Sequence, residues 1–226
     1  MSIEKSVTIT CPGCKTQSPF TIWSSVNTML SPEMKPAILD GSAFLFTCPH
    51  CGMKNNINYD LLYHQMEDHI MIQYATSDEY ANQFMDTMSG KSPIKELQSM
   101  VDDMVQQHYL IRIVRSLNQL REKIAILDAG LDDRIVEIYK LLIQSTYHEQ
   151  HPDAPLPEVL FSANPEQREF YLYADSKYAG TANLADDLYD EIKSNYQKLL
   201  PDLRDDGYFI DHQWALNFFS QLSEEK

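Results

Sequence analysis

The sequence predicts an α+β protein with an N-terminal β module, a helical middle, and a C-terminal β-hairpin followed by helices. Up to about residue 76, several short segments alternate between apolar and polar residues, as half-buried strands do. From Ser77 onward, apolar residues recur at helical spacing until a proline-rich stretch at 151–157 interrupts the pattern. These changes predict three regions, which are residues 1–76, 77–150 and 151–226.

The composition restricts the class of partner. The chain has 226 residues, of which 43% are hydrophobic, so it can bury a substantial core. Its formal net charge is −15, and residues 77–226 hold 27 acidic side chains against 14 basic ones. Nucleic-acid binding needs clustered basic charge, so this balance argues against it. We therefore expect a protein or peptide partner.

The N-terminus predicts a cytoplasmic protein without a membrane partner. The first six residues lack the basic end and apolar run of a signal peptide, and no apolar stretch approaches membrane-spanning length. A reducing cytosol would keep the cysteines as thiols, whereas secretion by an unrecognised route would reopen the choice of disulfides.

Several elements are expected in the β module. Strands at 6–10 and 20–26 form a hairpin with a cysteine turn at its tip, and further strands are expected at 43–47, 56–59 and 68–74. Ser31, Pro32 and Glu33 predict the start of an inserted helix, which Gly41 ends.

The remaining elements follow from the helical period and its interruptions. We expect helices at 77–90 and from Ser92 to about 105, and two more that begin at about 117 and at 132. The segment 109–115 is ambiguous between a strand and a continuing helix. Its alternation favours a strand with Arg112 facing outward. After the prolines we expect a hairpin of 159–161 and 170–173 with its turn at 164–166, a helix at about 184–199, and an aromatic end (Trp214, Phe218, Phe219) that packs back on the body.

The chain contains four cysteines, in the matched turns Cys11-Pro12-Gly13-Cys14 and Cys48-Pro49-His50-Cys51. A Cys-x-x-Cys turn points two thiolates at one ion, and two turns supply the four ligands of a tetrahedral zinc site. A full thiolate shell leaves no position for water. The turns therefore predict one structural zinc ion, with His50 directed away from it.

Redox chemistry is the alternative for these cysteines. Cys48-Pro49-His50-Cys51 has the same four letters as the active turn of some disulfide oxidases, in which a helix N-terminus lowers the thiol pKa. The residues after this turn, 52–57, do not favour a helix. A redox site would also have no use for a second matched pair of cysteines. The pairing of two turns favours the metal site.

Paired Cys-Pro-x-Cys turns near the N-terminus resemble the CpXC domain family. Further similar stretches are found on both sides of the second turn and beyond it: 20–26, 44–47, 58–64, 112–116, 122–124 and 130–134. The resemblance covers roughly residues 5–145. It implies a zinc-ribbon-like bacterial domain without an established activity.

Aromatic and histidine residues follow the second turn. Tyr59, Tyr63, His64 and His69 either line a binding groove or complete the small core of the module. Aromatics at such spacing are more often packing residues than ligand contacts, which favours the core interpretation.

A second polar set consists of arginines and carboxylates. Its members either pair with one another or hold an anionic group of a ligand: Arg112, Arg115, Glu122, Lys123, Asp132, Asp133 and Arg134. Asp132 and Asp133 follow Gly130, where they would cap the next helix. Capping and ion pairing explain these residue types without a ligand and are therefore favoured.

Common enzyme motifs are absent from the sequence. It has no phosphate-binding glycine loop, no Gly-x-Ser-x-Gly motif and no His-Glu-x-x-His helix. The first hypothesis is a non-enzymatic interaction or adaptor protein with structural zinc. The alternative is an enzyme that acts on a small anionic substrate held by Arg112, Arg115 and Arg134.

Overall fold

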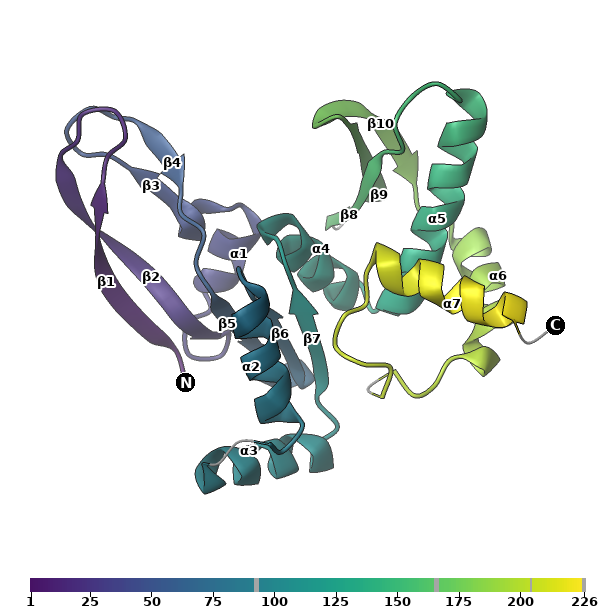
Figure 1. Cartoon of the computed structure of the whole chain (residues 1–226), viewed down its shortest axis with the longest axis horizontal. Coiled ribbons are helices and arrows are strands. Elements are labelled where there is room, and N and C mark those ends of the chain that lie inside the picture. The colour runs from purple at the N-terminus through teal and green to yellow at the C-terminus, as the bar shows by residue number, and fades with distance from the viewer. Residues whose placement is uncertain (92–93, 165–166, 204, 225–226) are drawn as a thin grey trace. The chain divides into compact units, whose positions relative to one another are not determined.

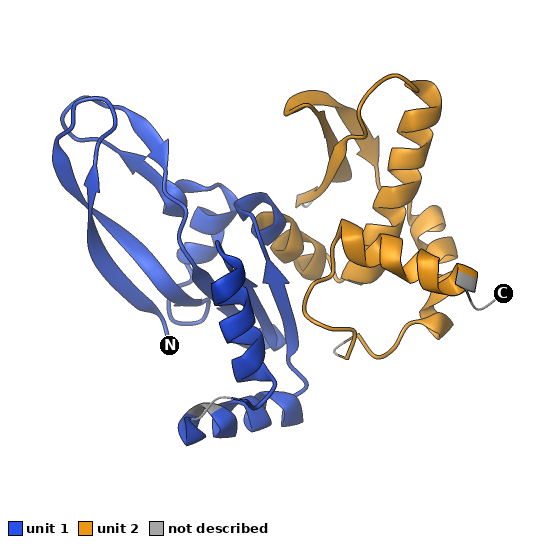
Figure 2. Ribbon diagram, viewed as in Figure 1, with its two compact units in different colours: residues 1–120 blue, residues 121–226 orange. Residues whose placement is uncertain are grey.

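The computed structural model describes residues 1–226 except 92–93, 165–166, 204 and 225–226. The chain forms two compact units, Met1–Leu120 and Arg121–Lys226 (Figure 2). The boundary between them falls inside helix α4 (Leu117–Asp128). This grouping differs from the three regions that the sequence suggests, because strand pairing joins residues 77–120 to the N-terminal residues.

The first unit is built on a mixed five-stranded sheet of order β1-β2-β5-β6-β7. Its strands have these bounds: β1 Ile3–Thr10, β2 Gln17–Asn27, β5 Leu61–Gln65, β6 Ile70–Tyr74 and β7 Leu110–Val114. β1 pairs with β2 and β5 with β6 in antiparallel fashion, whereas β2 pairs with β5 and β6 with β7 in parallel. The predicted hairpin, strand β6 and strand β7 are thus present.

Both cysteine turns lie at one end of this unit. β1 and β2 extend to the first turn, and a separate two-stranded sheet of β3 (Leu45–Thr47) and β4 (Lys54–Asn56) carries the second turn (Figure 1). The chain between the turns includes α1 (Met34–Leu39) and the 3-10 helix η1 (Ser42–Phe44). This short helix is the insertion that the sequence predicts.

Two helices, α2 (Asp78–Met88) and α3 (Lys95–Gln106), connect β6 to β7. The Ser77 side chain caps α2 by accepting a hydrogen bond from the Tyr80 amide at 3.2 Å. The expected helix start at 92–93 lies outside the described residues. The change from strand to helix that the spacing predicts at Ser77 is confirmed.

The predicted orientation of Arg112 is wrong. Its side chain is fully buried, and it donates a hydrogen bond to the Ile111 carbonyl oxygen at 3.0 Å. Consecutive residues of β7 are buried, so both faces of this strand are covered and alternation does not separate an inner from an outer face. Strand β5 was not predicted, because its sequence LLYHQ mixes polar and aromatic residues.

The second unit combines the long helix α5 (Asp133–Gln150) with a three-stranded antiparallel sheet of order β10-β9-β8. The other elements are β8 Glu158–Asn164, β9 Gln167–Ala174, β10 Lys177–Asn183, α6 Asp186–Tyr196, the 3-10 helix η3 Gln197–Leu199 and α7 His212–Glu224. The predicted hairpin corresponds to β8 and β9, and residues 165–166 of its turn are outside the described residues. β10 was not predicted, because its small and polar residues include a glycine.

The core of the second unit lies between α5 and the sheet. Tyr139 of α5 stacks on Phe170 of β9 with ring centroids 5.1 Å apart. The aromatic side chains of α7, at Trp214, Phe218 and Phe219, pack against this core. The expectation that the aromatic end packs back on the body is confirmed.

The α+β class is confirmed by this combination of helices and sheets, with the cysteine turns in the N-terminal part. Among the described residues, no helix combines the length and the apolar character that crossing a membrane requires.

Candidate metal centre

The two cysteine turns have the same backbone geometry. In each turn, the backbone carbonyl of the first cysteine accepts a hydrogen bond from the amide of the fourth residue after it. The amide of the same cysteine donates a hydrogen bond to the carbonyl of the fifth residue. The distances are 2.9 Å for Lys15 N to Cys11 O, 3.0 Å for Cys11 N to Thr16 O, 2.9 Å for Gly52 N to Cys48 O and 2.9 Å for Cys48 N to Met53 O. The repeat in the sequence is therefore also a repeat in structure.

Each turn contains one left-handed residue at the same position. Lys15 has a φ of 61° and Gly52 a φ of 73°. This conformation reverses the chain immediately after the second cysteine, and glycine adopts it without the steric cost that other residues bear. The local backbone thus holds both cysteines of a turn on the same side.

The four sulfur atoms lie close together. The Sγ atoms of Cys11 and Cys51 are 3.6 Å apart, as are those of Cys14 and Cys48, and all four lie within 4.8 Å of one another. Four zinc–sulfur bonds of about 2.3 Å would separate the sulfurs by about 3.8 Å. The four thiols thus fit a single tetrahedral metal ion.

Each turn contributes one buried and one exposed cysteine. Cys11 and Cys48 are buried in a small apolar cluster with Phe46, whereas Cys14 and Cys51 are exposed. A Cβ atom at Gly13 would lie 2.9 Å from Cε of Met53, so the Met53 side chain, which follows the second turn, packs directly over the first turn. The packing of one turn on the other brings the two cysteine pairs together.

Backbone amides and neighbouring sulfurs set the ionisation of the thiols. Hydrogen bonds from the side chain and backbone of Thr16 lower the pKa of Cys14 to about 6. The Met53 amide favours the Cys51 thiolate, but hydrogen bonds with Cys11 and Cys14 raise the pKa of Cys51 to about 11. In the absence of a cation, the raised pKa therefore favours the neutral Cys51 thiol, and a divalent ion would favour the thiolate that binds it.

The predicted non-ligand role of His50 agrees with its position, since this residue is exposed within its turn. No carboxylate occurs in segments 5–32 and 41–59, which form the turns and their strands. The described His, Asp and Glu side chains therefore add no ligand to the four sulfurs.

The residues predicted to form a groove lie in the sheet and its core. Tyr59 is buried, stacks on Phe44, and donates a hydrogen bond to the Ala43 carbonyl at 3.0 Å. Tyr63 is fully buried and donates to Gln65 at 2.7 Å. These contacts account for the two phenol groups within the fold.

His64 is half-buried and forms a hydrogen bond with Tyr109, with 2.9 Å between Nε2 and the phenol oxygen. Burial is the main cause that lowers the pKa of His64, so its neutral form is favoured. His69 is exposed and stacks on the other side chain of this contact, Tyr109. A groove formed by these residues stays a prediction.

The arginines of the second polar set are divided between the two units. Arg115 belongs to the first unit, where its guanidinium binds the Ser77 carbonyl at 2.5 Å and the Asp78 carboxylate at 2.7 Å. Arg134 belongs to the second unit and is 4% exposed. It binds Asp132 at 2.8 Å and Asp206 at 3.1 Å.

Asp132 is also the cap of α5. Its Oδ1 accepts a hydrogen bond from the Arg134 amide at 3.0 Å, as helix capping predicts. The charges of Asp132 and Arg134 are thus matched by their neighbours. Ligand binding by Arg112, Arg115, Asp132, Asp133 and Arg134 stays a prediction.

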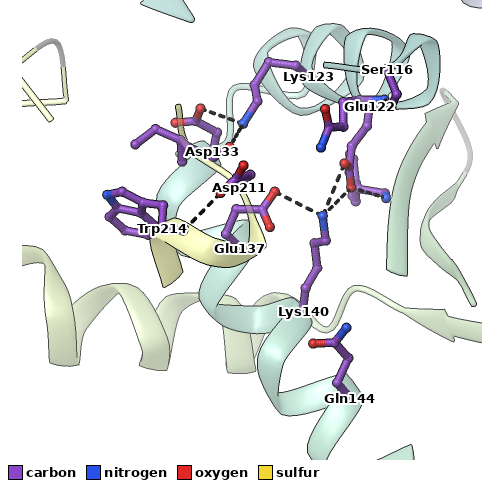
Figure 3. A network of polar contacts seen from close by, with 12 residues as sticks. Ser116, Glu122, Lys123, Asp133, Glu137, Lys140, Gln144, Asp211 and Trp214 are labelled. Carbon is purple, nitrogen blue, oxygen red and sulfur yellow. Dashed lines mark hydrogen bonds and ion pairs between the residues drawn. The ribbon is translucent and has the colours of Figure 1, made fainter. Parts of the chain in front are cut away.

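Glu122, Lys123 and Asp133 contribute instead to a buried network of charges in the second unit (Figure 3). Lys123 Nζ binds Asp133 at 2.9 Å and the Ile210 carbonyl at 2.8 Å. Lys140 Nζ lies 3.0 Å from a carboxylate oxygen of both Glu122 and Glu137. This network of charges connects α4, α5 and the segment before α7.

Glu137 and Lys140 were missed by the sequence reasoning, although a signal was present. Asp133, Glu137, Lys140 and Gln144 recur at spacings of four, three and four, which places them on one face of α5 (Figure 3). Burial is the main cause that raises the pKa of Glu137 to about 7, and Glu137 Oε2 has no hydrogen-bond partner among the described residues.

Comparison with known proteins gives one informative match. A family model described as CpXC protein matches residues 9–140. No curated protein and no solved structure gives a significant match. The matched segment includes both cysteine turns and covers more than half of the 226 residues, so the chain belongs to the CpXC family.

Proposed function

We propose that the protein binds one zinc ion per chain through Cys11, Cys14, Cys48 and Cys51, and that this zinc is structural. The observation that supports this most strongly is the clustering of the four sulfurs, two pairs of which are 3.6 Å apart and all of which lie within 4.8 Å of one another, as a tetrahedral shell requires. Four thiolates leave no position for water or substrate. Because the apolar cluster around the turns is small, metal binding contributes free energy to folding there.

We further propose that the protein acts in the cytoplasm as a non-enzymatic interaction or adaptor protein. A reducing compartment suits four free thiolates. The net charge of −15 favours a protein or peptide partner over nucleic acid. The ion pairs of Arg115 and Arg134 account for these side chains within the fold, which favours this role over catalysis on an anionic substrate.

The structural role of the metal is tested by removing one ligand. Cys48→Ser should lose zinc and lower the melting temperature, because three thiolates no longer complete the shell. His50→Ala, in the same turn, is the matched control and should keep both zinc and stability. Metal analysis and calorimetry of the two variants provide the measurement, and full zinc content with unchanged melting in Cys48→Ser would overturn the proposal.

The interaction role is tested by what the untagged protein retains when it is isolated from its own cells. A polypeptide that stays bound through size-exclusion chromatography supports this role. A retained small anion that is lost in a folded Arg134→Ala variant would replace it with the enzyme hypothesis.

A further inference from the structure

The second unit contains an uncharged pocket beside the strand β10. The pocket has a volume of about 270 Å³ and lies between the C-terminal half of α5, the sheet and α6. Its walls are mainly apolar and aromatic: Tyr139, Leu142, Ile143, Tyr147, Leu172 and Leu188. None of the described residues that line it carries a charged side chain, although 23% of the chain is charged.

The volume of the pocket indicates the size of the group that it can hold. Pockets that enclose drug-sized ligands have volumes of about 300–1,000 Å³, so this one suits a single large apolar side chain. Leu142 at its rim is 44% exposed, which leaves apolar surface next to solvent. The Tyr139 hydroxyl is already used, since it accepts a hydrogen bond from the Ala185 amide at 3.1 Å.

One wall of the pocket belongs to a strand at the edge of its sheet. β10 pairs with β9 on one side, and no described strand pairs with its other side (Figure 1). A register shift between Tyr178 and Gly180 interrupts the first half of β10. The regular half that follows contains Thr181, Ala182 and Asn183, which are the residues of β10 that line the pocket.

An open strand edge and a pocket of this size together match the recognition of an extended peptide. In this mode the peptide backbone adds a strand to the sheet, and a pocket receives one of its side chains. Charge then selects the peptide, because residues 121–226 hold 21 acidic side chains against 10 basic ones. Glu149 and Asp187, which are exposed, adjoin the pocket residues Gln150 and Leu188 in sequence.

We propose that the β10 edge and the adjoining pocket bind an extended segment of a partner protein, with one large apolar side chain in the pocket and lysine or arginine beside it. This inference rests on the proposed interaction role and assigns that role to a surface of the second unit.

The probe for this site is a phage-displayed library of short random peptides, selected on the full metal-loaded chain. Enriched peptides should share one leucine-, phenylalanine- or tryptophan-sized residue flanked by basic residues. Thr146→Trp on α5 and Thr181→Trp on β10 fill the pocket from two elements, and both positions are exposed. Each should weaken peptide binding at least about tenfold.

Thr87→Trp is the matched control. Thr87 is a half-buried residue of α2 in the first unit, and its hydroxyl donates to the carbonyl four residues earlier at 2.9 Å, as that of Thr146 does at 3.0 Å. This variant should bind the peptide as the wild type does. Hydrogen exchange adds a measurement that needs no variant, since bound peptide should slow the exchange of amides at 180–183.

Two outcomes would overturn this inference. One is the absence of any enriched peptide. The other is an enriched peptide that binds the folded Thr146→Trp and Thr181→Trp variants as it binds the wild type, or that leaves hydrogen exchange in β10 unchanged. The proposed interaction role would then require a different surface of the protein. Failure of the interaction role itself shows separately, as a chain that retains no polypeptide when isolated from its own cells.

Discussion

At the scale of residues, the left-handed position after each cysteine pair decides how well a turn forms. Gly52 has a φ of 73°, and a Cβ atom there would meet no atom within 4 Å. Gly52→Ala should therefore destabilise the metal-loaded protein through backbone strain alone, by about 1–2 kcal/mol. The equivalent change Lys15→Gly should have the opposite sign, because Lys15 already bears that strain at a φ of 61°. Denaturant unfolding of both variants measures the difference, and effects of equal sign would contradict this explanation.

The buried carboxyl group of Glu137 makes a second residue-scale prediction. Its pKa in the folded protein is raised to about 7 from an ordinary value of 4.5, mainly by burial. The stability associated with its protonated form is therefore fully present below pH 4.5 and is lost as the pH rises through about 7. Glu137→Gln keeps the neutral shape and lacks this loss, so its stability relative to the wild type should rise between pH 5 and 8.

The measurement for Glu137→Gln is the free energy of unfolding as a function of pH, taken as the difference from the wild type so that effects of the metal site cancel. Glu149→Gln on the exposed part of the same helix is the control, and its difference from the wild type should not change with pH. A pH-independent difference for Glu137→Gln would show that the buried carboxyl group is ionised throughout.

At the scale of elements, the charged network in the second unit connects α4 with α5. The side chains of Lys123 and Asp133 are 4% and 0% exposed. Lys123→Met removes a buried ammonium group that binds both the Asp133 carboxylate and the Ile210 carbonyl oxygen, which should cost about 3–5 kcal/mol of folding stability. Lys91→Met removes an exposed pair with Asp86, whose side chains are 71% and 62% exposed, and should cost less than about 1 kcal/mol. Equal losses, measured by denaturant unfolding, would contradict a role of burial in this network.

The elements also show which features could be predicted from the sequence. Alternation and helical spacing predicted β1, β2, α2 and α5 because the apolar residues of each recur at the period of a strand or a helix. The meeting of the four cysteines could be predicted because ligand type and spacing are local properties of each turn. The burial of Arg112, Glu122 and Lys123 could not, because it depends on how separate elements pack.

At the scale of the whole molecule, the division into two units predicts a local response to metal removal. The four cysteines of the proposed metal site lie within Met1–Leu120, whereas α5 and its sheet form their core within Arg121–Lys226. A zinc chelator should therefore increase amide hydrogen exchange in β1 to β4 and leave exchange in α5 and β8 to β10 nearly unchanged. Equal loss of protection in both units would mean that they unfold together.

The central claim is that four thiolates hold one structural metal ion. Native mass spectrometry of the untagged protein, compared with its denatured mass, tests this claim most directly. The predicted result is a mass excess of one zinc ion per chain in the wild type, and no such excess in Cys48→Ser. A native wild-type mass without metal, or a denatured mass reduced by the hydrogens of two disulfides, would contradict it.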